Sequence, residues 1–160
     1  MTIQVGDHLP QVTFRVSGKD GPEARTTDDI FKGRRVVLVG VPGAFTPSCH
    51  RNHLPGFVEK QAEIKARGID AVAITSVNDV FVLDAWRQAS GAEGLEFLAD
   101  GNAEFAKALG LEMDGTGFGL GPRSQRYAML VEDGVVRILN VEDSPAKTEL
   151  SGVEALLKVL

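Results

Sequence analysis

The chain has 160 residues, 43% hydrophobic and 24% charged, with a formal net charge of −5. This composition is typical of one folded domain over residues 1–160, and it excludes an intrinsically disordered chain. The acidic balance disfavours nucleic acid or an anionic membrane as partner, and no apolar stretch approaches the roughly 20 residues that span a bilayer. Because the N-terminal residues lack the features of a secretory signal and the single cysteine cannot form an internal disulfide, we expect a reducing, cytoplasmic compartment.

The first half of the chain alternates strands with helices. Continuous β-branched runs at residues 34–41 and 69–77 predict two strands that are buried on both faces. Between them, apolar residues of the segment 54–64 recur at helical spacing. Pro55 is expected to kink this helix or break its first turns, and Gly68 is expected to end it.

The pattern continues through the middle of the chain. Asn78 is expected to cap a helix over residues 81–89, since an asparagine side chain satisfies the free amides at a helix start. A short strand is predicted at residues 95–98 and a further helix at residues 103–109.

The last third predicts a hairpin and a terminal helix. Residues 126–141 form two alternating apolar runs joined at Asp133-Gly134, a strong turn signal. Ser151 and Glu154 have the spacing of a capping box before the apolar C-terminal segment. Strand–helix units followed by a hairpin predict an α/β fold, a central mixed sheet flanked by helices on both faces, in the thioredoxin-like layout.

The only cysteine, Cys49, follows the first predicted strand by eight residues and lies at or near the start of a helix. Unpaired amides and the helix dipole stabilise a thiolate at such a position. Thr46 lies one helical turn earlier and can present its hydroxyl on the same side, and Pro42 and Pro47 stiffen the loop. From the residues alone, a reactive thiol and a buried, inert cysteine both remain open.

The segment "PGAFTPSCH", residues 42–50, closely resembles the active-site signature of the peroxiredoxins, in which a proline, a threonine and the peroxidatic cysteine correspond to Pro42, Thr46 and Cys49. The following "HLPGF" is similar to the type II, peroxiredoxin-five-like branch. The likeness extends through "SVNDVFVLDAW", "LAD" and "RSQRYAMLVEDGVV" to the C-terminal helix, which is nearly the whole chain.

The resemblance implies a thiol peroxidase that reduces hydrogen peroxide and alkyl hydroperoxides. In such an enzyme the Cys49 thiolate attacks a peroxide oxygen and becomes a sulfenic acid, while Thr46 and an arginine hold the peroxide and Pro42 shields the sulfur. The sulfur carries the redox chemistry, so the family needs no metal, haem or flavin.

The family's catalytic arginine precedes an aromatic residue near the hairpin, which Arg126 before Tyr127 matches. Arg123 is the rival candidate. If both lay on one strand they would face opposite ways, so only one could point at the sulfur. We expect that residue to be Arg126.

Many relatives carry a second, resolving cysteine before the last helix, where this chain has Leu150. The resemblance therefore implies a one-cysteine form whose sulfenic acid is reduced by an outside thiol, with glutathione or glutaredoxin as the usual reductant. It also implies a homodimer that pairs through loops around the active site, with Phe45, Phe81 and Trp86 as candidate contacts. The helical spacing of Trp86 fits a core residue as well as an interface residue. The alternative from another class is a peroxide-responsive redox sensor or regulatory binding module.

Two other patterns have weaker interpretations. Cys49, His50 and His53 do not match a structural zinc pattern, and the histidines lack the partners of a cysteine-protease base. The glycine-rich segment 115–121 fits neither a dinucleotide fingerprint nor a Walker loop, so we expect a flexible surface loop near the active site.

Overall fold

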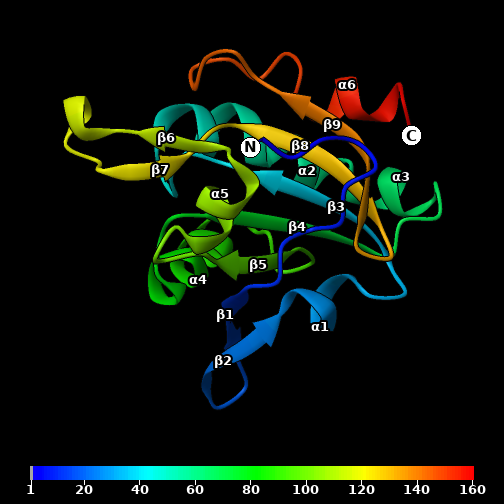
Figure 1. The fold of residues 1–160 in the computed structure, drawn as a ribbon, viewed down its shortest axis with the longest axis horizontal. Helices are drawn as coiled ribbons and strands as arrows, with labels where there is room; N and C mark the ends of the chain where they lie inside the picture. Colours follow the sequence, from blue (N-terminus) through cyan, green and yellow to red (C-terminus); the bar gives the residue numbers. More distant parts are fainter. Residues whose placement is uncertain (1) are drawn as a thin grey trace.

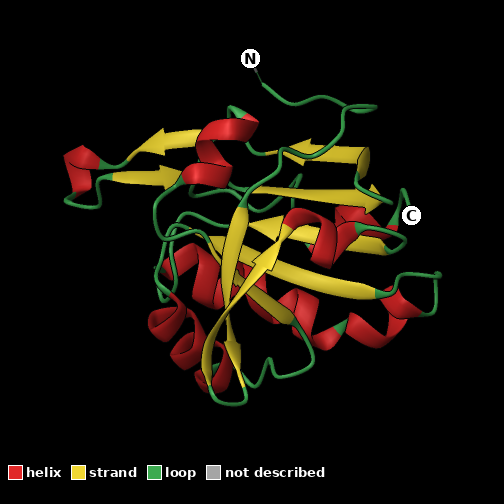
Figure 2. Ribbon diagram, turned by 60° about the horizontal axis from the view of Figure 1, so that its bottom comes forward, coloured by secondary structure: helices red, strands yellow, loops and turns green. Residues whose placement is uncertain are grey.

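The computed structural model describes residues 2–160 and is organised around one seven-stranded sheet (Figure 1). Its strands, in spatial order, are β2 (Gly21–Thr26), β1 (Thr13–Gly18), β5 (Glu96–Ala99), β4 (Ala71–Ser76), β3 (Arg35–Gly40), β8 (Tyr127–Glu132) and β9 (Val135–Val141). The central strands β5, β4 and β3 are parallel, and the flanking strands pair antiparallel. A separate hairpin, β6 (Glu112–Asp114) and β7 (Pro122–Ser124), projects from the main sheet (Figure 2).

Helices cover both faces of the sheet, because successive residues of the central strands point to opposite sides. The helices are α1 (Thr27–Phe31), a π-helical turn η1 (Cys49–His53), α2 (Leu54–Glu59), α3 (Gln61–Lys65), α4 (Val80–Ala89), α5 (Glu104–Leu109), a 3-10 turn η2 (Thr116–Phe118) and α6 (Val153–Leu157). On β3, Val37 and Val39 pack with α2, α3, α4 and α6, while Val36 and Leu38 pack with α1 and α5. This confirms the predicted α/β, thioredoxin-like arrangement.

The predicted central strands and the β8–β9 hairpin are confirmed with small changes at their ends. Both N-cap predictions are wrong. Asp79, not Asn78, caps α4 by accepting from the Val82 amide at 2.8 Å. Helix α6 begins after Gly152 without a side-chain cap, because the Ser151 hydroxyl donates to Glu142 instead.

The irregularity expected at Pro55 takes the form of a wider turn rather than a break. Pro55 lies in the first turn of α2, and the turn before it is π-helical, with the Leu54 amide bonded to the Cys49 carbonyl. Widening the turn relieves the clash between a proline ring and the carbonyl four residues earlier. The helical segment ends with Gly68 in the left-handed region (φ +83°), three residues beyond α3.

The sequence reasoning missed the N-terminal hairpin β1–β2, helix α1 and the β6–β7 hairpin. Strand β2 reads GPEART and is mostly exposed, so it lacks the apolar alternation on which strand prediction depends. Across residues 2–160, the structure contains no helix of the length and apolarity required to cross a bilayer.

Candidate active site

The loop after β3 leads directly to Cys49 and is anchored at both ends. The Val41 amide donates to the Thr75 carbonyl at 3.0 Å, which continues the β3–β4 ladder by one residue. The Ala44 amide donates to the Asn78 side-chain oxygen at 2.9 Å, so Asn78 positions this loop rather than capping α4. Pro42 is buried between these two anchors.

Thr46 closes a tight turn at the end of this loop. Its hydroxyl donates to the Gly43 carbonyl at 2.7 Å, while its own carbonyl accepts from the His50 amide at 2.9 Å. Because the hydroxyl proton is engaged with Gly43, the oxygen lone pairs of Thr46 are free to accept a hydrogen bond. Thr46 is therefore linked to the first helical turn that carries Cys49.

Cys49 is the first residue of the π-helical turn, and its side chain is 0% exposed. Residues 47 and 48 are already helical, so the cysteine lies within the first turn, as expected from the sequence. The wide turn leaves Cys49 and His53 both buried, at its two ends.

Arg126 directly precedes β8, and its side chain reaches the cysteine sulfur. The β3–β8 register pairs Gly40 with Tyr127, and the Tyr127 ring lies where a Cβ at position 40 would be, at 2.2 Å. Only glycine fits there, and this close approach holds Arg126 beside the loop that leaves β3. Its Nη2 donates to the Cys49 Sγ at 3.0 Å, and the residue is only 2% exposed.

The other two edges of the guanidinium are also occupied. Nε donates to the Pro145 carbonyl at 3.0 Å, and Nη1 donates to Nδ1 of His53 at 2.9 Å. An arginine can only donate hydrogen bonds, so Nδ1 of His53 must be unprotonated. The His53 Nε2–H then donates to the Ser151 carbonyl at 2.9 Å, and the ring is neutral.

His53 is held in this neutral form by its surroundings. Its pKa is lowered from 6.5 to about 4, chiefly by burial and to a smaller degree by the Arg126 charge, against the opposing effect of the Ser151 carbonyl. Behind it, the buried Glu142 accepts from both the amide and the hydroxyl of Ser151, at 2.5 and 2.6 Å. The Glu142 amide also donates to the Arg126 carbonyl at 2.9 Å.

His53, Glu142 and Ser151 are site residues that the sequence reasoning did not assign. His53 belongs to the "HLPGF" segment that carries the resemblance, but its sequence position suggests only a metal ligand or a protease base. Glu142 and Ser151 follow the hairpin, and no local pattern marks them as neighbours of Cys49. Its spacing to Glu154 instead predicts that Ser151 caps the C-terminal helix.

Arg123 lies near the same loop but not on the sulfur. Its Nε donates to the Leu120 carbonyl at 3.0 Å, and its Nη1 lies 3.1 Å from the position of a Cβ on Gly43. The assumption that Arg123 and Arg126 share one strand is wrong, because β7 ends at Ser124 and β8 begins at Tyr127. The glycine-rich segment forms the tip of the β6–β7 hairpin and includes η2.

Two further sequence candidates have structural partners. His50 accepts a hydrogen bond on Nδ1 from the Trp86 indole at 3.0 Å. Trp86 itself is 0% exposed, so its assignment as a dimer contact is wrong. Within residues 2–160, no group of three or more His, Cys, Asp and Glu side chains is arranged to hold a metal ion.

These contacts define the chemistry available to the sulfur. The Arg126 guanidinium donates a hydrogen bond to Sγ, and a fixed positive charge at this distance stabilises negative charge in a buried site. A thiolate with a fixed cation beside it can attack an electrophile and have the charge that develops on the leaving atom stabilised without reorganisation.

The chain matches the Redoxin family model over residues 4–157. It is 47% identical to peroxiredoxin-2E-2, chloroplastic, of Oryza sativa subsp. japonica, over 99% of this chain and 73% of that relative. Among solved structures, reduced Prx3 of Vibrio vulnificus in complex with H2O2 has a TM-score of 0.94 at 48% identity, covering 98% of both chains. Peroxiredoxin 5 of Alvinella pompejana has a TM-score of 0.84 at 33% identity, covering 98% of this chain and 96% of its own.

The fold, the thiol and these likenesses define a thiol-dependent enzyme, and the chain belongs to the Redoxin family, among its peroxiredoxins. It is a thiol peroxidase that reduces peroxides, of the type II, peroxiredoxin-five-like branch. Its single cysteine fits the one-cysteine form.

The buried, neutral His53 predicts a stability that falls in acid. Its pKa is lower in the folded chain than in the unfolded chain, so its contribution is complete above pH 6.5 and is lost as the pH falls to about 4. The shift corresponds to roughly 3 kcal/mol of unfolding free energy. Urea unfolding at pH 7 and pH 4, at fixed protein concentration, measures it.

His53→Gln is the matched control, because glutamine keeps a donor and an acceptor but does not titrate. The difference between the wild-type and variant pH profiles isolates this histidine from the carboxylates. Parallel profiles would show that His53 is not held neutral by burial.

Proposed function

We propose that Cys49 is the peroxidatic nucleophile and that Thr46, Pro42 and Arg126 complete the catalytic set. The observation that carries the proposal is the Arg126 Nη2 at 3.0 Å from the Cys49 Sγ, with the other edges of the guanidinium fixed by His53 and Pro145. The fixed guanidinium supports two roles, stabilising the thiolate and binding the peroxide oxygens.

The chemical step transfers one oxygen atom. The thiolate sulfur attacks the terminal peroxide oxygen, the S–O bond forms as the O–O bond breaks, and the leaving oxygen takes a proton to depart as water or an alcohol. Sulfur is oxidised to the sulfenic acid and the peroxide is reduced. The Thr46 oxygen accepts the hydrogen bond of the incoming peroxide, and the buried Pro42 limits access of other reactants.

For substrates we propose hydrogen peroxide and alkyl hydroperoxides. Support comes from the solved Vibrio vulnificus relative, which is described in complex with H2O2 and is 48% identical to this chain. The loop residues in the signature belong to a segment anchored at Val41 and Ala44, which supports fixed positions for the groups that would bind a small substrate.

For the reductant we propose an outside thiol, with glutathione or glutaredoxin in that role. The chain has one cysteine, and the exposed Leu150 occupies the region where many relatives carry a resolving cysteine. An internal disulfide is therefore impossible, and the sulfenic acid has to be reduced by a second molecule.

The test is peroxide consumption by wild type and by Cys49→Ser, with glutathione plus glutaredoxin and, separately, with thioredoxin. We expect turnover with the first system only, and none for Cys49→Ser with either. Equal rates for the two chains would remove Cys49 as nucleophile. Turnover with thioredoxin alone would leave the nucleophile in place but overturn the reductant.

We further propose a homodimer that forms through the surface beside the active-site loop. Phe45 and Phe81 remain the candidate contacts, since their side chains are 48% and 70% exposed. Phe81 lies in the first turn of α4, and Phe45 packs near His50 and Trp86, so both are next to the catalytic loop. Exposed aromatic residues of this size are common at the centre of protein interfaces.

Phe81→Glu is expected to weaken this dimer by more than about tenfold, because a buried interface aromatic is replaced by a charge. Sedimentation velocity across a dilution series measures the change. Val159→Glu is the control, since Val159 is also exposed but lies at the C-terminus, beyond α6. A monomeric wild type, or an equal effect of both substitutions, would contradict the proposed interface.

We propose a reducing, cytoplasmic location. The single cysteine supports this, because the proposed cycle requires an ample supply of external thiol. Two relatives, one from rice at 47% identity and one from Arabidopsis thaliana at 44% identity, are described as chloroplastic. Fractionation of cells that make the natural protein would distinguish a cytoplasmic from an organellar location.

A further inference from the structure

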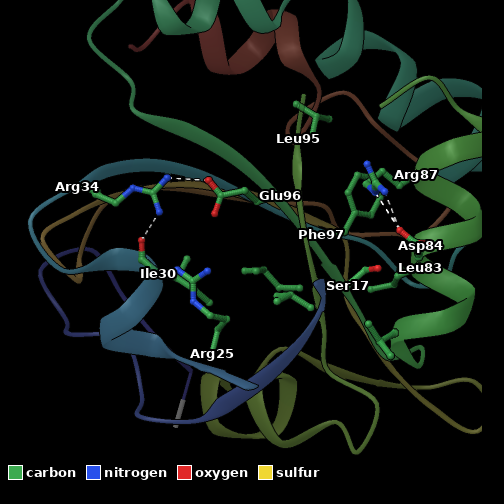
Figure 3. Close-up of a pocket in the computed structure, with 13 residues that line it drawn as sticks. Ser17, Arg25, Ile30, Arg34, Leu83, Asp84, Arg87, Leu95, Glu96 and Phe97 are labelled. Carbon is green, nitrogen blue, oxygen red and sulfur yellow. Dashed lines mark hydrogen bonds and ion pairs between the residues drawn. The ribbon is translucent and has the colours of Figure 1, made fainter. Parts of the chain in front are cut away.

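A cavity of about 480 Å³ lies between the β1–β2 hairpin, α4 and β5 (Figure 3). None of its lining residues belongs to the loop 41–49, and Arg126 is not among them. Cavities of a few hundred Å³ are the size that binds small organic molecules. The mechanism described above makes no use of this space.

Its lining combines apolar and polar surface in comparable amounts. Ile30 of α1, Leu83 of α4, and Leu95, Phe97 and Leu98 in and beside β5 line the cavity, and all five are buried within the fold. A mixed lining suits a ligand that has both an apolar body, which contacts these side chains out of water, and a polar or charged group for the remaining surface.

The charged residues around the cavity divide into paired and unpaired groups. Arg34 donates to Glu96 at 2.7 Å and to the Ile30 carbonyl at 2.9 Å, and Arg87 donates to Asp84 at 2.8 Å (Figure 3). The second oxygen of Asp84 accepts from Gln88. The charges of Arg34 and Arg87 are therefore balanced by Glu96 and Asp84.

Arg25, on β2, is the third arginine of the cavity. Over residues 2–160 it forms no ion pair, and its guanidinium makes one hydrogen bond, to the Asp29 carbonyl at 3.2 Å. Hydrogen bonds from Thr26 and, to a lesser degree, the Arg25 charge lower the pKa of the Asp29 carboxyl, so these two charges interact. The Asp29 carboxylate is nevertheless engaged with the Thr26 amide in the α1 capping box and does not line the cavity. Arg25 is half-buried, so its charge is partly removed from water without a partner in the cavity.

We propose that this cavity binds a small organic anion, with one carboxylate on an apolar body. The carboxylate would accept a bidentate pair of hydrogen bonds from Arg25, and the body would lie against Leu83 and Phe97. The lining carries three arginines and two acids, a net charge of +1 in a chain of −5, which favours a monoanion over a phosphate dianion. This site is independent of the proposed catalytic set.

The chain contains its own reporter of occupancy. Phe97 lines the cavity, and its ring centroid lies 5.8 Å from that of Trp86, the only tryptophan. Displacement of Phe97 by a ligand changes the environment of the indole. Titration of the reduced protein with octanoate is therefore expected to change the tryptophan fluorescence saturably, whereas octan-1-ol, which has the same chain length but no charge, binds at least about tenfold more weakly.

Arg25→Gln is expected to weaken octanoate binding about tenfold or more, while Arg15→Gln leaves it unchanged. Both changes remove one positive charge from the first two strands, but Arg15 is exposed and does not line the cavity. Arg25→Glu is expected to reverse the preference, so that octylammonium binds and octanoate does not. Equal binding of octanoate and octan-1-ol, or equal losses in the two glutamine variants, would overturn the proposal.

Amide chemical shifts locate the bound ligand and separate this cavity from the active site. Octanoate is expected to shift the amides of Ser17, Leu95 and Phe97. Shifts confined to residues 43–50 and 126 would instead mean that the carboxylate binds beside Cys49, and an absence of any saturable response would mean that the cavity does not take an organic anion. Either result would overturn the inference.

Discussion

Replacing Arg126 by methionine is expected to lower peroxidase activity by about 10²–10³-fold while leaving the chain folded. Methionine is uncharged and fills the part of the buried space that the arginine stem occupies, but it removes the cation at 3.0 Å from the sulfur. The thiolate then loses its partner, and so does the oxygen that leaves the peroxide. The second-order rate constant for peroxide, from stopped-flow oxidation of the protein, measures the loss.

Arg126→Met also removes two structural hydrogen bonds, because His53 and the Pro145 carbonyl lose their donor. Leaving buried polar atoms unpaired costs about 1–3 kcal/mol each, so the variant should unfold at lower urea concentration than wild type. Circular dichroism before each kinetic measurement distinguishes lost catalysis from lost fold. Arg126→Lys keeps a positive charge but cannot make the three hydrogen bonds of the guanidinium at once. We expect this variant to be closer to wild type in stability than in peroxidase activity.

Arg123→Met is the matched control for this prediction. It makes the same chemical change in a residue that lies against Gly43 and bonds the Leu120 carbonyl, but does not reach the sulfur. Its effect on the rate constant is therefore expected to be far smaller. A reversed order, with Arg123→Met inactive and Arg126→Met active, would mean that Arg123 supplies the cation during turnover.

Much of the sheet could be predicted from the sequence because its central strands are buried on both faces. Strands β3 and β4 are continuous, largely apolar runs, and short runs of this kind are typical of strands that are buried on both faces. The edge hairpin β1–β2 could not be found in this way, since β2 is exposed and contains Pro22 and Glu23. Its pairing with β1 depends on a partner strand and not on its own pattern.

The catalytic loop was predictable for a related reason. Pro42, Thr46 and Cys49 lie within eight residues, so one local segment contains the whole pattern and its spacing. Arg126 is 77 positions away from Cys49, and it was identified through resemblance and not through spacing. The residues behind it, Glu142 and Ser151, are brought in by the β8–β9 hairpin and the α6 start, which no local signal encodes.

The cap errors have the same physical origin. Asn78 and Ser151 are both residue types that cap helices, and each lies next to a helix start. In the folded chain, tertiary partners compete for their side chains. Asn78 accepts from the Ala44 amide and the Ser76 hydroxyl, and Ser151 donates to Glu142. Both polar groups are therefore used to position the active site, and the helices begin without them.

Peroxide supplied without any reductant is expected to inactivate the wild-type enzyme completely. With a single cysteine, no internal thiol competes for the sulfenic acid, so a second peroxide molecule oxidises it to the sulfinic acid and leaves as water or alcohol. Sulfinic acid is not reduced by ordinary thiols. Intact mass should show a gain of two oxygen atoms per chain, and activity should not return when glutathione is added afterwards.

Millimolar glutathione present from the start should instead trap a mixed disulfide, with one glutathione per chain by mass. Cys49 is 0% exposed, so a molecule of this size can reach the sulfenic acid only if the turn around it opens. The π-helical turn at Cys49–His53, ahead of Pro55, is the segment where such opening costs least, because its hydrogen bonds are the least regular of the helix. The rate of adduct formation should therefore level off at high glutathione concentration, at the rate of opening. A stable internal bond that cycles with thioredoxin, in place of both adduct and over-oxidation, would rule out the one-cysteine mechanism.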